Sequence, residues 1–269
     1  MTPNEFDDLE NTKFYLFKHF LSKLSDIIFT IIPIRRIIKK TKPDILHAHY
    51  AGVNGILGAL SGFHPFILTV WGSDVLIAEK SKIAKLLIKF VFKKADLITC
   101  DAEHIRKAII KLGANPQKIK IIYFGVDIEK FSPDQKDGKI IEQLRLQNSS
   151  VIISLRNLEP IYDLETLIRS IPLVLKELPK IKFIIVGKGS EEEKLKNLAK
   201  NLKIRENIDF IGFIPNDDLP KYLRTADIYV STSLSDAGIS ASTAEAMACG
   251  LPVIITDTGE NEKWVKDGE

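Results

Sequence analysis

The chain has 269 residues, of which 45% are hydrophobic and 27% are charged, and its net charge is +3 at pH 7. A chain of this length can bury a sizeable core in one large or two medium domains, and its composition excludes a disordered or fibrous protein. No run reaches the roughly 18 apolar residues of a membrane span, and because residues 1–11 are acidic and polar we do not expect a cleavable signal peptide there.

Short apolar runs alternate with helix-period stretches along almost the whole chain. Residues 13–42 show two amphipathic helix patterns split near Pro33. Strands are expected after them at 44–48, 66–70, 97–100, 119–123, 151–155, 183–186, 209–211, 228–231 and 253–256. Helices are expected at 82–94, 103–112, 164–178, 191–202 and 241–248. The strands are continuous in Ile, Val and Leu, which indicates sheets covered on both faces and an α/β fold with parallel strands.

The alternation breaks at residues 131–138, where polar residues, Pro and Gly follow one another. We therefore predict two Rossmann-like parallel-sheet domains, one over residues 1–131 and one over 132–269. Such domains are expected to face each other across a cleft and to bind ligands beyond the carboxyl ends of their strands.

Basic residues are concentrated in the first half of the chain. The excess lies in residues 35–42 and 80–94, whereas residues 135–269 carry a small acidic excess. Two interpretations remain open: solvated helix faces, or peripheral contact with an anionic membrane face or a phosphorylated lipid acceptor. Nucleic-acid binding is disfavoured because no platform of aromatic and basic residues is present.

The two cysteines, Cys100 and Cys249, lie far apart in sequence, and neither has metal-ligand spacing around it. Each ends an element that is apolar in sequence, so we expect small core residues in a reducing setting. The sequence therefore predicts a cytoplasmic protein, peripheral at the inner face of the membrane if the basic half makes contact there. We expect no metal site.

The most informative stretch is residues 233–255, whose pattern predicts a loop, a short Ala-rich helix and a buried strand. A helix N-terminus offers free backbone N–H groups and a positive dipole, so Gly238, Ile239 and Ser240 are candidates to hold a diphosphate. Glu245, the acid within this apolar helix, is a candidate to accept hydrogen bonds from ribose hydroxyls. A simpler interpretation also stays open, with Ser240 as an ordinary N-cap and Glu245 as a solvated side chain.

Seven segments in order along the chain resemble a known family. Residues 243–254 look like the donor-site signature of retaining GT-B glycosyltransferases of the large group-4 (glycosyl transferase group 1) family. The other six segments are residues 43–49, 72–74, 125–131, 186–189, 210–212 and 226–231. The resemblance covers roughly residues 31–269, and it implies the GT-B fold.

On the donor side, the resemblance implies that Arg156 clamps the diphosphate, because guanidinium pairs with phosphate in bidentate fashion. The family usually has Lys-Gly where this chain has residues 162–163, Tyr and Asp, so Lys188 is the candidate to replace the missing cation. Glu245 is expected at the ribose, and the base is expected against the backbone near Phe213.

The part of the family site that contacts the transferred sugar is altered. The family signature is Glu-x7-Glu, and eight residues before Glu245 stands Ala237. The neighbouring Asp236 is therefore the candidate to take the place of the first carboxylate.

On the acceptor side, Asp74 and His49 are the candidate catalytic residues. The family often has a histidine before Gly72, whereas this chain has Trp71, which cannot transfer a proton, so Asp74 is the remaining acid of that loop. A second interpretation of Asp74 stays equally open, namely an N-cap of the following helix. His47 and His49 are expected to point to opposite faces of their strand, one lining the cleft and the other packing.

The resemblance implies transfer of a hexosyl-type sugar from a nucleotide-diphosphate sugar to a glycan or lipid-linked acceptor hydroxyl, with retention, in cell envelope polysaccharide or glycolipid biosynthesis. It implies no cofactor beyond the donor. Two alternatives are a weak or inactive GT-B fragment that only binds nucleotide sugar and, less favoured, a UDP-sugar epimerase of the same fold. Compared with the family, both domains are expected to be incomplete, the first at its start and the second at its end.

Overall fold

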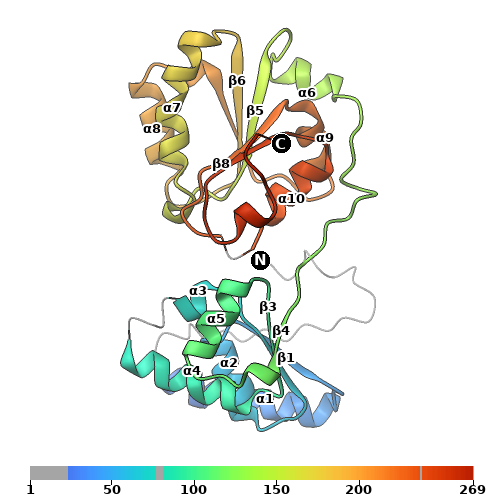
Figure 1. The fold of residues 1–269 in the computed structure, drawn as a ribbon, viewed down its shortest axis with the longest axis vertical. Coiled ribbons are helices and arrows are strands. Elements are labelled where there is room, and N and C mark those ends of the chain that lie inside the picture. The colour runs from blue at the N-terminus through green and yellow to red at the C-terminus, as the bar shows by residue number, and fades with distance from the viewer. Residues whose placement is uncertain (1–23, 77–80, 237, 269) are drawn as a thin grey trace. The chain divides into compact units, whose positions relative to one another are not determined.

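The computed structural model describes residues 24–76, 81–236 and 238–268, and the chain forms two compact units (Figure 1). The first unit comprises Met1–Cys100 and Arg106–Lys120, and the second comprises Asp101–Ile105 and Ile121–Glu269. The main divide thus falls at Lys120/Ile121, whereas the sequence predicted a boundary after Phe131. Phe131 is only 3% exposed and packs in a core cluster of the second unit, which explains why the segment leading to it groups there.

The first unit is built on a four-stranded sheet with the strand order β1-β2-β3-β4. Its strands are β1 (Leu46–His49), β2 (Phe66–Thr69), β3 (Leu97–Cys100) and β4 (Ile119–Ile121). The helices are α1 (Leu24–Thr41), α2 (Val53–Ser61), α3 (Ser73–Leu76), α4 (Lys82–Lys94) and α5 (Glu103–Lys111). The pairs β1–β2 and β2–β3 are parallel, and the helices that connect them, α2 and α4, pack together.

The expected split near Pro33 was wrong for the described residues, because Pro33 lies inside the single helix α1. The part of that prediction before residue 24 lies outside the described residues. A proline inside a helix costs about 3 kcal/mol. Packing of α1 on α2, together with a hydrogen bond of 2.5 Å from the Arg35 guanidinium to the Leu60 carbonyl, offsets this cost.

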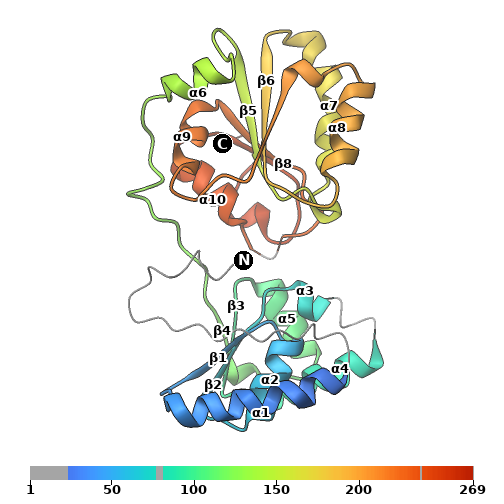
Figure 2. The ribbon, with the colours of Figure 1, turned by 180° about the vertical axis from the view of Figure 1, so that it is seen from behind.

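The second unit is built on a five-stranded sheet with the strand order β7-β6-β5-β8-β9, in which every pair is parallel. Its strands are β5 (Ser150–Leu155), β6 (Ile181–Val186), β7 (Ile208–Gly212), β8 (Ile228–Ser231) and β9 (Val253–Ile255). Its helices are α6 (Gly138–Gln143), α7 (Leu164–Glu177), α8 (Glu192–Asn201), α9 (Leu219–Thr225) and α10 (Ala241–Ala248). Figure 2 shows α7 and α8 on one face of this sheet and α6, α9 and α10 on the other.

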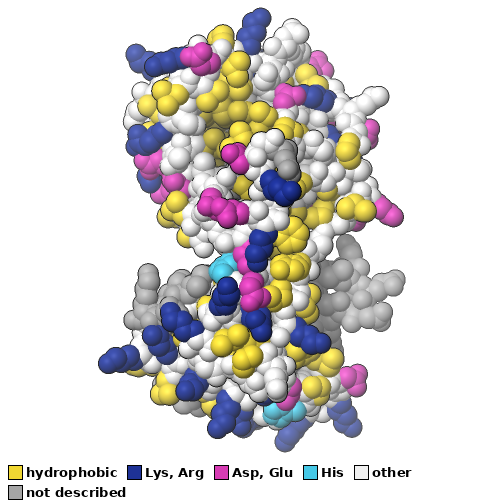
Figure 3. Space-filling view, in the orientation of Figure 1, with side chains coloured by type: hydrophobic (Ala, Val, Ile, Leu, Met, Phe, Trp, Pro, Cys, Tyr) yellow, Lys and Arg dark blue, Asp and Glu magenta, His cyan; other side chains and the backbone are white. Residues whose placement is uncertain are grey.

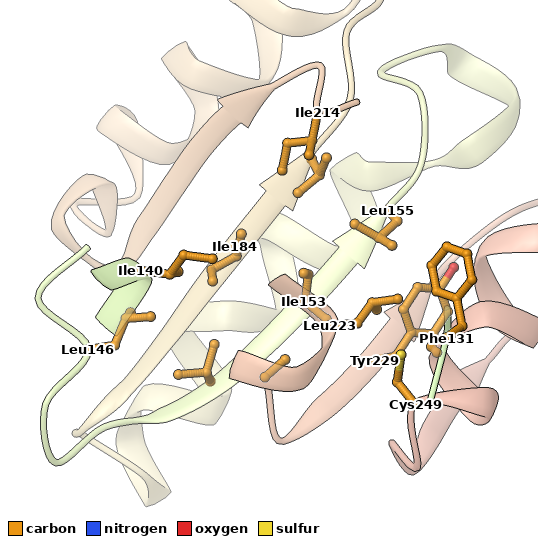
Figure 4. Close-up of a cluster of buried hydrophobic side chains, with 14 residues drawn as sticks. Phe131, Ile140, Leu146, Ile153, Leu155, Ile184, Ile214, Leu223, Tyr229 and Cys249 are labelled. Carbon is orange, nitrogen blue, oxygen red and sulfur yellow. The ribbon is translucent and has the colours of Figure 1, made fainter. Parts of the chain in front are cut away.

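Two apolar clusters lie on opposite faces of this sheet. Ile153 and Ile184 belong to the cluster that includes residues of α6, α9 and α10, whereas their neighbours Ile152 and Ile185 belong to the cluster that includes residues of α7 and α8. Successive strand residues point to opposite faces, so a continuous apolar strand serves both clusters. Figure 4 shows the first cluster, with Tyr229 and Phe131 at one end of it. The two-domain α/β prediction is confirmed at this level.

Among the described residues, no helix has the length and apolar character needed to cross a bilayer.

Candidate functional site

The strand order of the second unit reverses between β5 and β8. From β5 the chain adds β6 and β7 on one side, and then β8 and β9 on the other. In open parallel sheets, ligands bind beyond the carboxyl ends of the strands at such a switch point. β5 ends at Leu155 and β8 ends at Ser231, so Arg156 and the segment that begins at residue 232 emerge there.

Arg156 is fixed at this point, with a side chain that is 7% exposed. Its guanidinium forms an ion pair with Asp236, donates to Ser233 Oγ at 2.9 Å, and stacks on Tyr162 with 4.5 Å from Cζ to the ring centroid. A further contact to Ser242 Oγ is long, at 3.5 Å. The buried Nε has no hydrogen-bond acceptor among the described residues. The guanidinium is therefore held in place on several sides, with donor capacity left over.

Asp236 contacts Arg156, the cation that we expected to bind the diphosphate. Its side chain is 10% exposed, and its carboxylate accepts from Arg156. Desolvating two charges is tolerated when they are paired and hydrogen bonded, but it is costly when one partner is lost. The pair therefore neutralises Arg156 internally, and contact of Asp236 with a sugar stays a prediction.

Glu245 lies on α10 and ends a chain of polar contacts. Lys130 Nζ donates to Asn216 Oδ1 and, at 2.6 Å, to Asp217 Oδ1, and the Asn216 side chain hydrogen bonds to Glu245. Burial raises the pKa of Glu245, and the Asn216 hydrogen bond and the Lys130 charge oppose this increase. Glu245 is thus a half-buried, oriented carboxylate and not a fully solvated one.

The N-terminus of α10 lies just after the carboxyl end of β8. Ser240 is its N-cap, and the Ser240 Oγ accepts from the Thr243 backbone N–H at 3.3 Å. Gly238 and Ile239 before it are buried, with Ile239 9% exposed. The cap uses one of the end amides, so the positive end of this helix still faces the switch point.

The loops after β5 and β6 are joined tightly. Leu158 N donates to Lys188 O at 3.0 Å, and Ser190 N and Oγ donate to the Glu159 carboxylate at 2.9 and 2.6 Å. Gly187 has φ of +137°, and a Cβ there would lie 2.3 Å from the Arg156 carbonyl oxygen. Glycine at 187 therefore allows this loop to approach the segment that holds Arg156.

Lys188 and Phe213 stand at the open end of β6 and β7. Lys188 is exposed, and its side chain extends to within 3.5 Å of where a Cβ of Gly212 would lie. Phe213 is 70% exposed, whereas the following Ile214 is buried in the core. The two predicted ligand contacts are therefore accessible, but no contact between described residues orients either side chain toward Arg156.

The first unit gathers the predicted acceptor-side histidines on one face, which corrects the sequence analysis. The rings of His47 and His49 lie 4.4 Å apart, because residues two apart in a strand point the same way. Trp71 Nε1 donates to His49 Nδ1 at 3.2 Å, and His47 Nε2 bonds to Thr69 Oγ1 at 2.7 Å. Burial, followed by the neighbouring His49, lowers the pKa of His47.

Asp74 lies in α3 and hydrogen bonds to the backbone just before the start of α2. Its Oδ2 accepts from the Ala51 backbone N–H at 2.7 Å, and its Oδ1 is buried without a hydrogen-bond partner among the described residues. Burial raises the pKa of Asp74 despite several backbone hydrogen bonds that lower it. The structure thus gives Asp74 a structural contact, and its catalytic role stays a prediction.

Sequence reasoning missed the residues that orient the predicted ones: Ser233, Ser242, Tyr162, Asn216 and Lys130. They come from five separate segments, and no spacing signal connects them to Arg156 or Glu245. The described part of the chain contains no group of three or more His, Cys, Asp or Glu side chains arranged to hold a metal ion.

Comparison with known proteins identifies the family. Residues 136–269 match the model of glycosyl transferases group 1, and residues 4–102 match glycosyl transferase 4-like proteins. A UDP-Gal:alpha-D-GlcNAc-diphosphoundecaprenol alpha-1,3-galactosyltransferase of Escherichia coli is 30% identical over 254 residues, which cover 88% of this chain and 64% of that protein. An uncharacterized glycosyltransferase of Methanocaldococcus jannaschii is 31% identical over 187 residues, 68% of this chain and 46% of that protein.

Solved structures share the fold. The crystal structure of the Anabaena protein HepE in complex with UDP and glucose has a TM-score of 0.78 at 21% identity, covering 93% of this chain and 68% of that one. The chain spans about half to two thirds of the length of the curated relatives it matches, from 46% to 64% for the two above. The two parallel-sheet units, the order of the motifs and these matches agree, and the chain belongs to the glycosyl transferase group 1 family with the GT-B fold.

Proposed function

We propose that this chain acts as a nucleotide-sugar-dependent glycosyltransferase, with the donor held at the switch point of the second unit. The observation that supports this most is the placement of Arg156, the N-terminus of α10 and Glu245 around the carboxyl ends of β5 and β8. A cation, a positive helix end and an oriented carboxylate are the groups that a diphosphate joined to a ribose requires.

In this proposal the diphosphate meets Arg156 and the amides of residues 238–240, with Lys188 as a second cation. Glu245 accepts hydrogen bonds from the ribose hydroxyls, and the base lies against the backbone beside Phe213. The HepE structures with UDP and with UDP-glucose support a nucleoside-diphosphate donor for this fold. The donor itself is the only small molecule that the scheme requires.

We infer a retaining transfer of a hexosyl-type sugar through an oxocarbenium-like state. The departing diphosphate takes the proton of the acceptor hydroxyl, and the protein supplies orientation and charge stabilisation. Asp236 is the candidate to contact the sugar, once its carboxylate has released Arg156. His49 and Asp74 are the candidates to contact the acceptor, which is a glycan or a lipid-linked sugar on the cytoplasmic side of a membrane.

The names of two relatives support a lipid-linked acceptor and a role in envelope polysaccharide or glycolipid synthesis. The E. coli relative is named for a diphosphoundecaprenol acceptor, and a Mycolicibacterium smegmatis relative, 26% identical, for phosphatidylinositol monomannoside. A second candidate function is binding of the nucleotide sugar without turnover. The ion pair of Arg156 with Asp236 favours this candidate, because the cation meant for the diphosphate already has a partner.

A turnover assay separates the two functions. The chain is incubated with radiolabelled UDP- and GDP-sugars and a membrane extract, and label in the lipid fraction is measured together with nucleoside diphosphate release. An active enzyme transfers label and loses this activity in Asp236→Ala or His49→Ala. Donor binding without label transfer would support the binding function and contradict catalysis.

A further inference from the structure

The outward face of α4 in the first unit combines lysines with exposed apolar side chains. Ile83 is 74% exposed and Leu86 is 71% exposed. At 3.6 residues per turn, positions 82, 85, 86 and 89 lie on one stripe of this helix, and Ile83 lies beside it one turn before Leu86. The opposite face of α4 packs into the core through Ile88, Val91 and Phe92, so the fold does not need the outward apolar residues for its own packing.

A hollow of about 350 Å³ lies along this stripe, and its lining is mainly basic. The lining residues are Lys82, Lys85, Leu86, Lys89, Lys111 and Leu112. Lys111 is the last residue of α5, so the hollow lies between two helices of the unit. Figure 3 shows basic side chains gathered with hydrophobic ones over this part of the chain.

Three lysines of α4 have no local counter-charge, because within the described residues no carboxylate forms an ion pair with Lys82, Lys85 or Lys89. Several like charges around exposed Ile and Leu side chains are unfavourable in water alone. They are favourable against a partner that presents anions above an apolar layer, which is the arrangement of an anionic lipid bilayer.

We propose that this α4 surface, composed of Lys82, Ile83, Lys85, Leu86, Lys89 and Lys111, docks on an anionic lipid bilayer. The lysines contact headgroup phosphates, their stems lie along the helix, and Ile83 and Leu86 enter the level beneath the headgroups. An acidic protein would satisfy the lysines, but it would leave the apolar residues at the centre of the surface without a matched environment.

The first test measures co-sedimentation of the full 269-residue chain with vesicles. Vesicles containing phosphatidylglycerol should bind the chain, pure phosphatidylcholine vesicles should not, and 0.5 M salt should weaken the binding. Each lysine near an anionic surface is worth about a fivefold change in partitioning. The triple variant Lys82→Glu, Lys85→Glu, Lys89→Glu should therefore lose about a hundredfold or more.

A matched control reverses three exposed lysines of the second unit, Lys139→Glu, Lys200→Glu and Lys203→Glu. This variant has the same net charge as the triple variant of α4. If net charge alone decides vesicle binding, both variants should therefore lose it equally. We expect the control to retain most of the binding. Equal loss in the two triple variants would contradict a localised surface.

The apolar part is tested by Ile83→Ser with Leu86→Ser, which should weaken vesicle binding about tenfold while the salt sensitivity remains. Nucleotide binding and circular dichroism are read in parallel for every variant. Because vesicle binding needs no donor and no turnover, its failure is distinguishable from failure of the proposed function. Absence of wild-type binding, equal binding to zwitterionic vesicles, or preference for soluble polyglutamate over vesicles would overturn the proposal.

Discussion

At the scale of single residues, the central feature of the second unit is that Arg156 is already neutralised. The ion pair with Asp236, the Ser233 hydrogen bond and the Tyr162 ring hold its guanidinium before any ligand arrives. A diphosphate must either use the remaining donors or displace Asp236. The ion pair therefore stabilises the folded chain but weakens the affinity of Arg156 for the donor diphosphate.

The variant Asp236→Asn tests this opposition. Removing the carboxylate charge leaves Arg156 free to meet an anion, so UDP or GDP binding should tighten several-fold in calorimetry. Asn retains an acceptor oxygen but not the charge, so the free energy of unfolding should fall by about 1–3 kcal/mol. Weaker nucleotide binding in this variant would instead show that Asp236 supports the ligand directly.

A surface pair provides the stability control. Asp217 pairs with Lys130 at 2.6 Å, but its side chain is 94% exposed. Asp217→Asn should change the free energy of unfolding by less than about 1 kcal/mol, because exposed ion pairs contribute little. A loss as large as that of Asp236→Asn would show that burial does not explain the difference.

Asp74 gives a second prediction at this scale. Burial raises its pKa in the folded state, so the folded chain holds this proton more tightly than the unfolded chain. The contribution of Asp74 to stability is therefore greatest at acid pH. It is lost as the pH rises from the pKa that Asp74 has in the unfolded chain to and beyond its higher pKa in the folded chain.

Asp74→Asn retains an oxygen for the Ala51 N–H and removes this titration. Relative to wild type, the variant should gain stability as the pH rises from about 3 to 7, measured by urea unfolding. If Asp74 is also a catalytic acid, transfer activity falls although stability does not. If the stability difference between wild type and Asp74→Asn stayed constant across this pH range, it would contradict the claim that burial raises the pKa of Asp74.

At the scale of elements, the loops after β5 and β6 set the position of the site. Gly187 and Gly189 let the two loops approach closely, and a Cβ at residue 189 would lie 2.2 Å from the Leu158 carbonyl oxygen. The two nearest atoms belong to the Leu158 backbone, which cannot move aside as a side chain can, and the Glu159 carboxylate follows at 2.9 Å. These glycines are therefore required by packing between loops.

Gly187→Ala should destabilise the chain by about 3 kcal/mol, because its φ of +137° disfavours a side chain and the Arg156 carbonyl would clash. Gly138→Ala, at the start of α6, has nothing within 4 Å of the new Cβ and should be neutral or slightly stabilising. Thermal unfolding of the two variants provides the comparison. Similar melting temperatures would contradict the close approach of the loops.

The elements were largely predictable because their apolar periods are long and regular. All nine predicted strands are present, and α4 and α10 match their predicted bounds. Four helices were not predicted: α2, which contains two glycines, and the short helices α3, α6 and α9. The predicted split at Pro33 was wrong because the packing of α1 on α2, which retains the proline inside the helix, leaves no signal in the local pattern.

The site was predictable only in part. Arg156 and Glu245 could be chosen because each follows a recognisable segment. The partners that orient them lie on segments far apart in sequence, and only the folded chain brings Tyr162 and Asp236 to the same guanidinium. The shared face of His47 and His49 should have followed from the strand period alone.

At the scale of the whole molecule, the two units carry different candidate contacts. The second unit contains two apolar clusters and the complete set of donor-side candidates. The first unit contains the paired histidines and the α4 surface. Nucleotide binding is therefore expected to depend on the second unit, whereas acceptor and membrane contacts are expected to depend on the first.

The most direct test of this account is isothermal titration calorimetry of the full chain with UDP and with GDP, repeated on Glu245→Ala. We predict one binding site in the wild-type chain for at least one of the two nucleotides. We also predict a loss of about 1.5–3 kcal/mol of binding free energy in the variant, the worth of a hydrogen bond to a charged group. An absence of heat with both nucleotides and with their sugars, or an unchanged dissociation constant in Glu245→Ala, would contradict the donor site proposed at the switch point.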